Sequence, residues 1–224
     1  MMSARGTVLL FVLLAGCWSP AQERARQEER EERQKLEERR WDQAAFSIKE
    51  AITPLHPKVR AFALRMAGLS SGEYNFGQVS AIWSYLKGNW NYANDPRGFE
   101  YFAPAFESVE ANLTGDCDDF AILMASSIEA IGGSARVVLA YAKDSAHAYC
   151  EVYVSDNPEH ARGIVEELAI IENYKGVHFH KDQQGYWLNL DYSAAYPGGP
   201  FAPALFEVAV YPNGEWTVIS GQGA

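Results

Sequence analysis

Residues 114–121, Thr-Gly-Asp-Cys-Asp-Asp-Phe-Ala, contain the change from loop to helix on which the predicted fold depends. Carboxylates such as Asp118 and Asp119 suit the first turn of a helix, because they interact favourably with the positive end of its dipole. An apolar run follows, and the Gly132-Gly133 pair predicts the helix C-terminus. Cys117 is therefore expected at a helix N-terminus, a position that favours the nucleophilic thiolate.

An imidazole and a further carboxylate follow in segments with strand character. His147 begins the segment 147–154, and Asp191 ends the segment 185–191. A thiol, an imidazole and a carboxylate in this order suggest a nucleophile, a general base and a residue that orients the base.

Three acidic residues close to Cys117 in the chain oppose thiolate formation: Asp116, Asp118 and Asp119. Their effect is weakest if the carboxylates point to solvent or accept hydrogen bonds from first-turn amides. For Asp118 or Asp119, simple stabilisation of the helix N-terminus is an alternative role.

The order of elements predicts an α+β fold, in which N-terminal helices pack on an antiparallel sheet. Amphipathic helices are expected from about Trp41 to Ile52, where Pro54 and Pro57 follow, and again over 59–69 and 79–90. The segment 162–171 suits either a helix or a strand. Strands are expected over 135–141, 147–154, 185–191, 205–211 and 215–219, the last two flanking a hairpin turn at Pro212-Asn213-Gly214.

Cys150 could form a disulfide with Cys117, but the strand pattern favours a buried free thiol. In 146–154 one face carries His147 and other polar or aromatic residues, whereas Cys150 lies on the apolar face. If Cys117 faces His147, Cys150 points away from both.

The N-terminus predicts export and lipidation. Residues 1–16 combine a basic residue, Arg5, with the short apolar run 8–14, as signal peptides do. The sequence Leu-Ala-Gly-Cys at 14–17 resembles a bacterial lipobox, which makes Cys17 the expected lipidation site and the cell envelope the expected location. An ordinary secretory signal is the alternative.

The predicted organisation is a signal peptide (1–16), a lipidated cysteine with a charged tether (17–50) and one domain (51–224). Residues 22–40 are almost entirely charged or amide residues, which suits a solvated helix or a disordered tether. The formal net charge of −10 disfavours nucleic acid as a partner. Membrane attachment is expected through the lipid alone.

The motifs around Cys117, His147 and Asp191 resemble the transglutaminase-like superfamily, over roughly residues 59–192. The resemblance implies a papain- or transglutaminase-like core with Cys117 as nucleophile, His147 as base and Asp191 as orienter. The backbone N–H of Cys117 is one candidate donor to the oxyanion of the reaction, and Trp83, Trp90 or Tyr92 could supply a side-chain donor.

No cofactor or metal is expected. His178 and His180 share a strand face, with His160 elsewhere, but lack partners at convincing ligand spacing and are interpreted as exposed polar residues. The predicted function is that of a cysteine-dependent amide hydrolase or acyl transferase acting on proteins or peptides. The alternatives are a non-catalytic binding module with this fold and a structural lipoprotein.

Overall fold

The computed structural model describes residues 19–96, 101–172 and 176–220, and the backbone alone at 169–172. The chain divides into two compact units, residues 1–40 and 41–224. Helix α1 (Pro20–Ala51) runs through the boundary between them.

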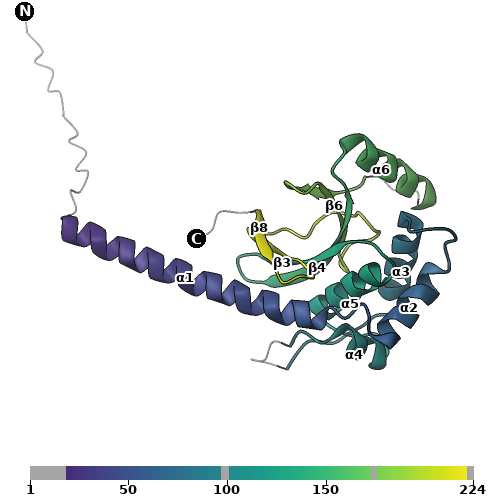
Figure 1. Cartoon of the computed structure of the whole chain (residues 1–224), viewed down its shortest axis with the longest axis horizontal. Coiled ribbons are helices and arrows are strands. Elements are labelled where there is room, and N and C mark those ends of the chain that lie inside the picture. The colour runs from purple at the N-terminus through teal and green to yellow at the C-terminus, as the bar shows by residue number, and fades with distance from the viewer. Residues whose placement is uncertain (1–18, 97–100, 173–175, 221–224) are drawn as a thin grey trace, which may run out of the picture. The chain divides into compact units, whose positions relative to one another are not determined.

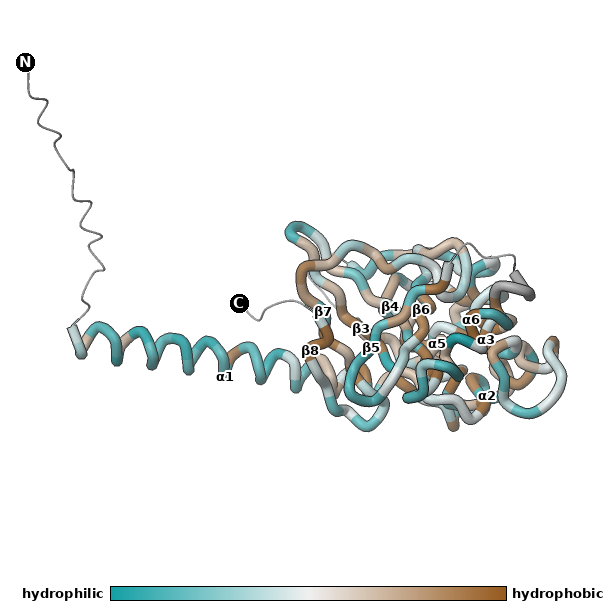
Figure 2. The backbone as a smooth tube through the Cα atoms, turned by 90° about the horizontal axis from the view of Figure 1, so that it is seen from above, coloured by the Kyte–Doolittle hydropathy of each residue, from teal (hydrophilic) through white to brown (hydrophobic). Residues whose placement is uncertain are grey.

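In the first unit, the described part of α1 is exposed and rich in charge, and Figure 2 shows hydrophilic residues along most of this helix. An exposed i,i+4 ion pair joins Arg33 to Glu29, as expected for a solvated helix. For residues 22–40 the sequence suited either a solvated helix or a disordered tether, and the structure has the helix. Of the helices in the described ranges, none has a stretch long and apolar enough to cross a membrane. The predicted signal peptide and Cys17 lie outside the described residues.

The second unit begins where α1 becomes amphipathic. Ala45, Ile48 and Ala51 are buried, and Trp41 packs edge-on against Tyr141 with the ring centroids 5.5 Å apart. The remaining helices are α2 (Pro57–Ala67), α3 (Phe76–Asn89), α4 (Ala105–Glu110), α5 (Cys117–Ala130) and α6 (Pro158–Glu172).

Six antiparallel strands form the main sheet, in the order β5-β6-β4-β3-β7-β8. The sheet is curved, and α5 packs against it with α2, α3 and α4 close by (Figure 1). The strands are β3 (Ala135–Tyr141), β4 (Ala146–Ser155), β5 (Phe179–Lys181), β6 (Tyr186–Leu190), β7 (Phe206–Val210) and β8 (Trp216–Ser220); β1 (Asn91–Tyr92) and β2 (Thr114–Gly115) form a separate parallel pair.

Strand alternation gives the sheet two different faces. The main hydrophobic core contains α5 and the apolar face of the sheet, including Val137, Cys150 and Leu188. The other face carries His147 and several buried polar side chains. Cys150 is completely buried in the main core, and both Cys117 and Cys150 are free thiols. The prediction that Cys150 is a buried free thiol is therefore confirmed.

The predicted fold class is also confirmed, with differences in detail. The ambiguous segment 162–171 belongs to helix α6. The connection between α3 and the Cys117 helix contains α4, β1 and β2, none of which the sequence pattern indicated.

Candidate active site

The thiol of Cys117 is positioned by a tight turn before helix α5. Asn112 and Leu113 have φ values of 55° and 59°, a left-handed conformation that non-glycine residues rarely adopt. Gly115 follows in β2, where an added Cβ would lie 2.3 Å from a carboxylate oxygen of Asp119. Only glycine fits there, and its small size lets Asp119 close over the start of the helix.

Asp119 fixes the helix N-terminus through two backbone amides. Its Oδ2 accepts a hydrogen bond from the Asp116 N–H at 3.2 Å, and its Oδ1 accepts one from the Ala103 N–H at 3.0 Å. Burial raises the pKa of Asp119 to about 6, although the two amides oppose this shift. Asp119 therefore binds backbone amides as expected for these carboxylates, but the amides belong to the N-cap residue and to Ala103 and not to the first turn of the helix.

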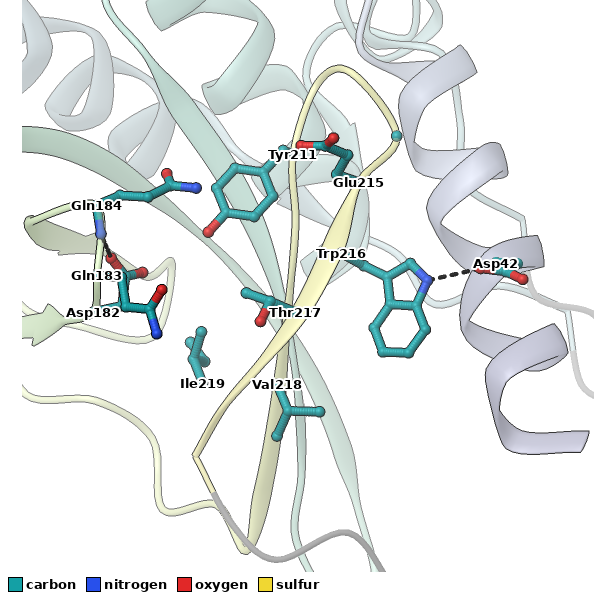
Figure 3. Close-up of a pocket in the computed structure, with 11 residues that line it drawn as sticks. Asp42, Asp182, Gln183, Gln184, Tyr211, Glu215, Trp216, Thr217, Val218 and Ile219 are labelled. Atoms are coloured by element: carbon teal, nitrogen blue, oxygen red, sulfur yellow. Dashed lines mark hydrogen bonds between the residues drawn. The ribbon is translucent and has the colours of Figure 1, made fainter. Parts of the chain in front are cut away.

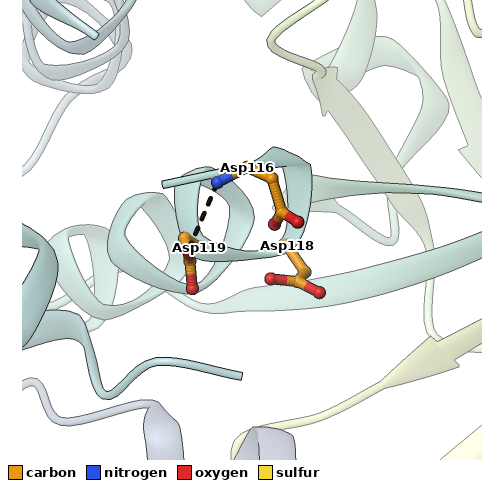
Figure 4. Close-up of side chains that lie close together, drawn as sticks. All are labelled: Asp116, Asp118 and Asp119. Atoms are coloured by element: carbon orange, nitrogen blue, oxygen red, sulfur yellow. Dashed lines mark hydrogen bonds between the residues drawn. The ribbon is translucent and has the colours of Figure 1, made fainter. Parts of the chain in front are cut away.

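Asp118 is different, because its side chain is buried and points neither to solvent nor to a first-turn amide. Figure 4 shows its carboxyl group close to that of Asp116, while Asp119 turns toward the Asp116 amide. Burial, a hydrogen bond with Asp116 and the nearby negative charges raise the pKa of Asp118 to about 10. This raised pKa favours the neutral form of Asp118, which reduces the negative charge beside Cys117.

These three carboxyl groups are also the residues that could hold a metal. One oxygen from each of Asp116, Asp118 and Asp119 lies within 4.8 Å of the others, and in both Asp116 and Asp118 the Oδ1 atom is buried without a protein partner. Oxygen ligands of this kind suit Ca²⁺ or Mg²⁺. Without a cation, the proton on Asp118 reduces the repulsion between the carboxyl groups.

The structure brings Cys117, His147 and Asp191 together. His147 is the second residue of β4, and its Nε2 lies 2.8 Å from Oδ1 of Asp191, the residue that follows β6. The Cys117 thiol lies close enough to the His147 ring to interact with it. Because Nε2 is bonded to Asp191, Nδ1 is the ring nitrogen left for the thiol.

Asp191 is completely buried and held rigidly by its neighbours. Its Oδ1 accepts a hydrogen bond from the Ser193 N–H at 2.7 Å, and its own N–H donates to Oδ1 of Asn189 at 3.0 Å. The Asn189 side chain in turn donates to the Gly199 carbonyl at 2.9 Å, which ties the loop after β6 to the strand. These contacts fix the carboxylate that orients the imidazole.

The environment of His147 favours the protonated imidazole. Burial alone would lower its pKa, but the hydrogen bonds to Asp191 and Cys117 and the negative charge of Asp191 raise it to about 10. At pH 7 the ring is therefore an imidazolium. An imidazolium beside a thiol favours the thiolate–imidazolium pair from which cysteine nucleophiles react.

The three aromatic candidates for an oxyanion donor have different partners. Trp83 Nε1 donates to the Leu190 carbonyl at 3.2 Å, and Trp90 Nε1 donates to the Gly115 carbonyl at 3.1 Å. The side chain of Tyr92, by contrast, lies close enough to Cys117 to interact with it.

The prediction that His180 is an exposed polar residue is wrong. Its Nδ1 lies 2.6 Å from Oε1 of Glu151, which is buried together with Arg136. The Arg136 guanidinium bonds Glu151 at 2.7 Å, also pairs with Asp182, and lies 4.1 Å from the Trp187 ring centroid. Sequence alternation placed Glu151 on the polar face, but it could not show which residues from other strands neutralise it.

The hollow shown in Figure 3 is separate from these residues. It has a volume of about 700 Å³ and is lined mainly by β8 and by the turn between β5 and β6, with Asp42, Asp182 and Tyr211 contributing. Asp42 accepts a hydrogen bond from Trp216, and Asp182 is paired with Arg136. Its lining includes none of Cys117, His147 and Asp191, so this hollow is not part of the candidate active site.

A family model for the transglutaminase-like superfamily matches residues 60–191, which include Cys117, His147 and Asp191. This chain belongs to the transglutaminase-like superfamily. No curated protein matches the sequence.

Several solved structures match part of this chain. A candidate cysteine protease from Cytophaga hutchinsonii is 26% identical, with a TM-score of 0.36 over 43% of this chain and 33% of its own. Calcium-bound LapG from Legionella pneumophila is 16% identical, with a TM-score of 0.45 over 73% of this chain and 82% of its own. The chain spans about a third of the length of the Cytophaga protein.

Sequence reasoning named the three residues that meet, but it missed the side chains that hold them. Asn189 could have been found, because it lies two residues before Asp191 and therefore on the same face of the strand. Tyr92 was one of three candidates, and nothing in its spacing separated it from Trp83 and Trp90. The burial of Asp118 left no signal in the sequence.

Proposed function

We propose that this protein is an exported, lipid-anchored cysteine hydrolase or acyl transferase that acts on amide bonds of proteins or peptides. The observation that carries the proposal is the continuous chain of contacts from the Cys117 thiol through His147 to Asp191. The superfamily contains cysteine-dependent enzymes of this kind, and the sequence keeps all three residues.

The first step in this proposal is attack on a carbonyl group. The Cys117 thiolate forms a bond to the carbonyl carbon, and the carbonyl oxygen takes up the negative charge. His147 holds the proton that came from the thiol, and Asp191 keeps the ring oriented through Nε2.

Collapse of this intermediate breaks the C–N bond. The His147 imidazolium gives its proton to the departing amine, which leaves a thioester on Cys117. Neutral His147 then accepts a proton from water or from an acceptor amine as it attacks the thioester. The C–S bond then breaks and the thiolate returns to Cys117, so that water yields a free acid and an amine yields a new amide. Of these two branches we favour hydrolysis.

Attachment to a membrane in this proposal depends on residues 14–17, with the lipid on Cys17. Growth of an expressing bacterium with an alkyne-bearing fatty acid tests it. Label is expected on the full chain and lost in Cys17→Ser. Label retained by that variant, or absent from both proteins, would contradict lipidation at Cys17.

The enzymatic part is tested by the reaction of the folded protein with iodoacetamide, followed site by site by peptide mass spectrometry. We expect Cys117 to react rapidly near neutral pH, and we expect His147→Ala to slow this reaction at least about tenfold, because the imidazolium stabilises the thiolate. Cys150 is an internal control, since its complete burial raises the pKa of its thiol well above the usual value.

Equal rates in the wild-type protein and His147→Ala would contradict an activated pair and favour a binding module that has kept the fold. A Cys117 that reacts only after reduction would favour the structural lipoprotein with a disulfide.

A further inference from the structure

The proposed reaction needs hydrogen-bond donors for the oxygen that becomes negatively charged. One is available from the backbone, because the N–H of Cys117 is in the first turn of α5 and has no acceptor within the helix. Oxyanion sites commonly combine such an amide with a donor from a second segment. That second donor has to come from a side chain close to the Cys117 sulfur.

In two of the three aromatic side chains near this site, the only hydrogen-bond donor is already bonded to a backbone carbonyl. An indole ring has a single N–H group. In Trp83 it is bonded to the Leu190 carbonyl, and in Trp90 it is bonded to the Gly115 carbonyl. Both indoles are buried, so release of either N–H would break a hydrogen bond in the interior of the protein.

Tyr92 is held beside the thiol by the backbone. Strand β1 pairs in parallel with β2 so that Tyr92 lies opposite Gly115, two residues before Cys117. The amide of Asn91 donates to the Leu113 carbonyl at 2.8 Å, and the amide of Ala93 donates to the Gly115 carbonyl at 2.9 Å. These two bonds flank Tyr92, whose side chain lies close enough to that of Cys117 to interact with it.

The Tyr92 side chain is also accessible to a substrate. It is 49% exposed, and its ring stacks on that of Tyr192 with the centroids 5.8 Å apart. Partial burial and the negative charge at Cys117 and Asp116 raise the pKa of Tyr92 to about 12. Its hydroxyl therefore keeps its proton at pH 7 and can donate it in a hydrogen bond.

We propose that Tyr92 is the side-chain donor that stabilises the oxyanion in the reaction of Cys117. This inference rests on the proposed function. Before attack, the Tyr92 O–H donates to the sulfur. As the S–C bond forms, negative charge passes from the sulfur to the carbonyl oxygen, and the O–H donates to that oxygen instead. When the C–N or C–O bond breaks, the carbonyl is restored and the donor is released, with no proton lost from Tyr92.

The test compares two reagents that differ in the need for an oxyanion donor. Acylation of Cys117 by p-nitrophenyl acetate passes through a tetrahedral oxyanion, whereas alkylation by iodoacetamide does not. We expect Tyr92→Phe to slow acylation on the order of 100-fold, as loss of one oxyanion donor does in other enzymes. Alkylation should change less than about threefold, because the ring and its stacking on Tyr192 remain.

The matched control is Tyr192→Phe, which removes a hydroxyl from the ring stacked on Tyr92 and should leave both rates nearly unchanged. Thermal unfolding of each variant establishes that the fold is kept. Equal slowing of both reactions by Tyr92→Phe would show that Tyr92 only positions the thiol, and no slowing would show that it has no role; either result overturns the inference. If acylation of the wild-type protein does not require Cys117 or His147, the proposed function itself fails.

Discussion

Two groups of buried ionisable side chains in this protein differ in how completely they are paired. Around Arg136, the guanidinium bonds two carboxylates and a tyrosine hydroxyl, and a histidine bonds one of the same carboxylates. Around Cys117, buried oxygens of Asp116, Asp118 and Asp191 have no protein partner. Only one nitrogen of the Arg136 group, Nη2, is buried in that way.

The difference indicates different roles. A paired buried network fixes the arrangement of strands, and breaking it leaves an uncompensated charge. Unpaired buried oxygens cost free energy, and such groups concentrate at functional sites. We therefore expect substitutions around Arg136 to change stability, and substitutions around Cys117 to change chemistry.

The largest expected effect is on catalysis by His147. His147→Ala should slow steady-state hydrolysis of p-nitrophenyl acetate by a factor on the order of 10³ or more, because the base and the acid of the reaction are both lost. His160→Ala, at an exposed position on α6, is the matched control and should retain full activity. Similar rates in the two variants would remove the basis for assigning chemistry to the Cys117 group.

The next effect is on stability at Arg136. Arg136→Ala should lower the free energy of unfolding by about 3–5 kcal/mol, because buried Glu151 loses the guanidinium and keeps only the His180 ring as an ionisable partner. Lys58→Ala removes one member of an exposed ion pair with Glu110 and should cost less than about 1 kcal/mol. Urea unfolding measures both variants. A cost at Arg136 as small as that at Lys58 would contradict the stabilising role of the network.

Asp191→Asn should lower both the rate of hydrolysis and the pKa of His147. The amide cannot hold the imidazolium as the carboxylate does, so hydrolysis should slow by roughly 10²–10⁴-fold. The His147 pKa should fall from about 10 toward its usual value, as measured by NMR titration of the ring protons. An unchanged histidine titration would mean that Asp191 does not govern the charge of His147.

The raised pKa of His147 also predicts how the stability of the folded protein depends on pH. The folded-state pKa of His147 is raised, so its contribution is complete below the unfolded value of about 6.5. It is lost as the pH rises from there through about 10. Unfolding measured across this range should show a steeper loss of stability for the wild-type protein than for Asp191→Asn.

The smallest expected effect is at Asp118. Its raised pKa means that burial disfavours the charged form, so the wild-type protein loses stability as the pH rises from about 4 through about 10. Asp118→Asn should therefore be more stable than wild type at pH 7, on the order of 1 kcal/mol. The comparison is made with a chelator present, so that no cation neutralises the carboxylates. A destabilised Asp118→Asn would contradict the neutral form of Asp118.

Part of this arrangement was predictable because it follows from local patterns. The apolar run after Cys117 predicted α5, and period-two alternation predicted that Cys150 is buried away from His147. Both depend only on near neighbours in sequence. The ion pairs of Arg136 and the burial of Asp118 depend on residues that only the fold brings near. The two-residue strands β1 and β2 are likewise too short to leave a pattern, although they place Tyr92 beside the thiol.

The most direct test of the account is whether an acyl group can be trapped on Cys117 in a way that depends on His147. The folded protein is mixed briefly with p-nitrophenyl acetate, quenched in acid and mapped by mass spectrometry. We expect a single acetyl group on the peptide that contains Cys117 in the wild-type protein, and none there in His147→Ala. Acetylation of Cys117 to the same extent in both proteins, or only at other residues, would contradict it.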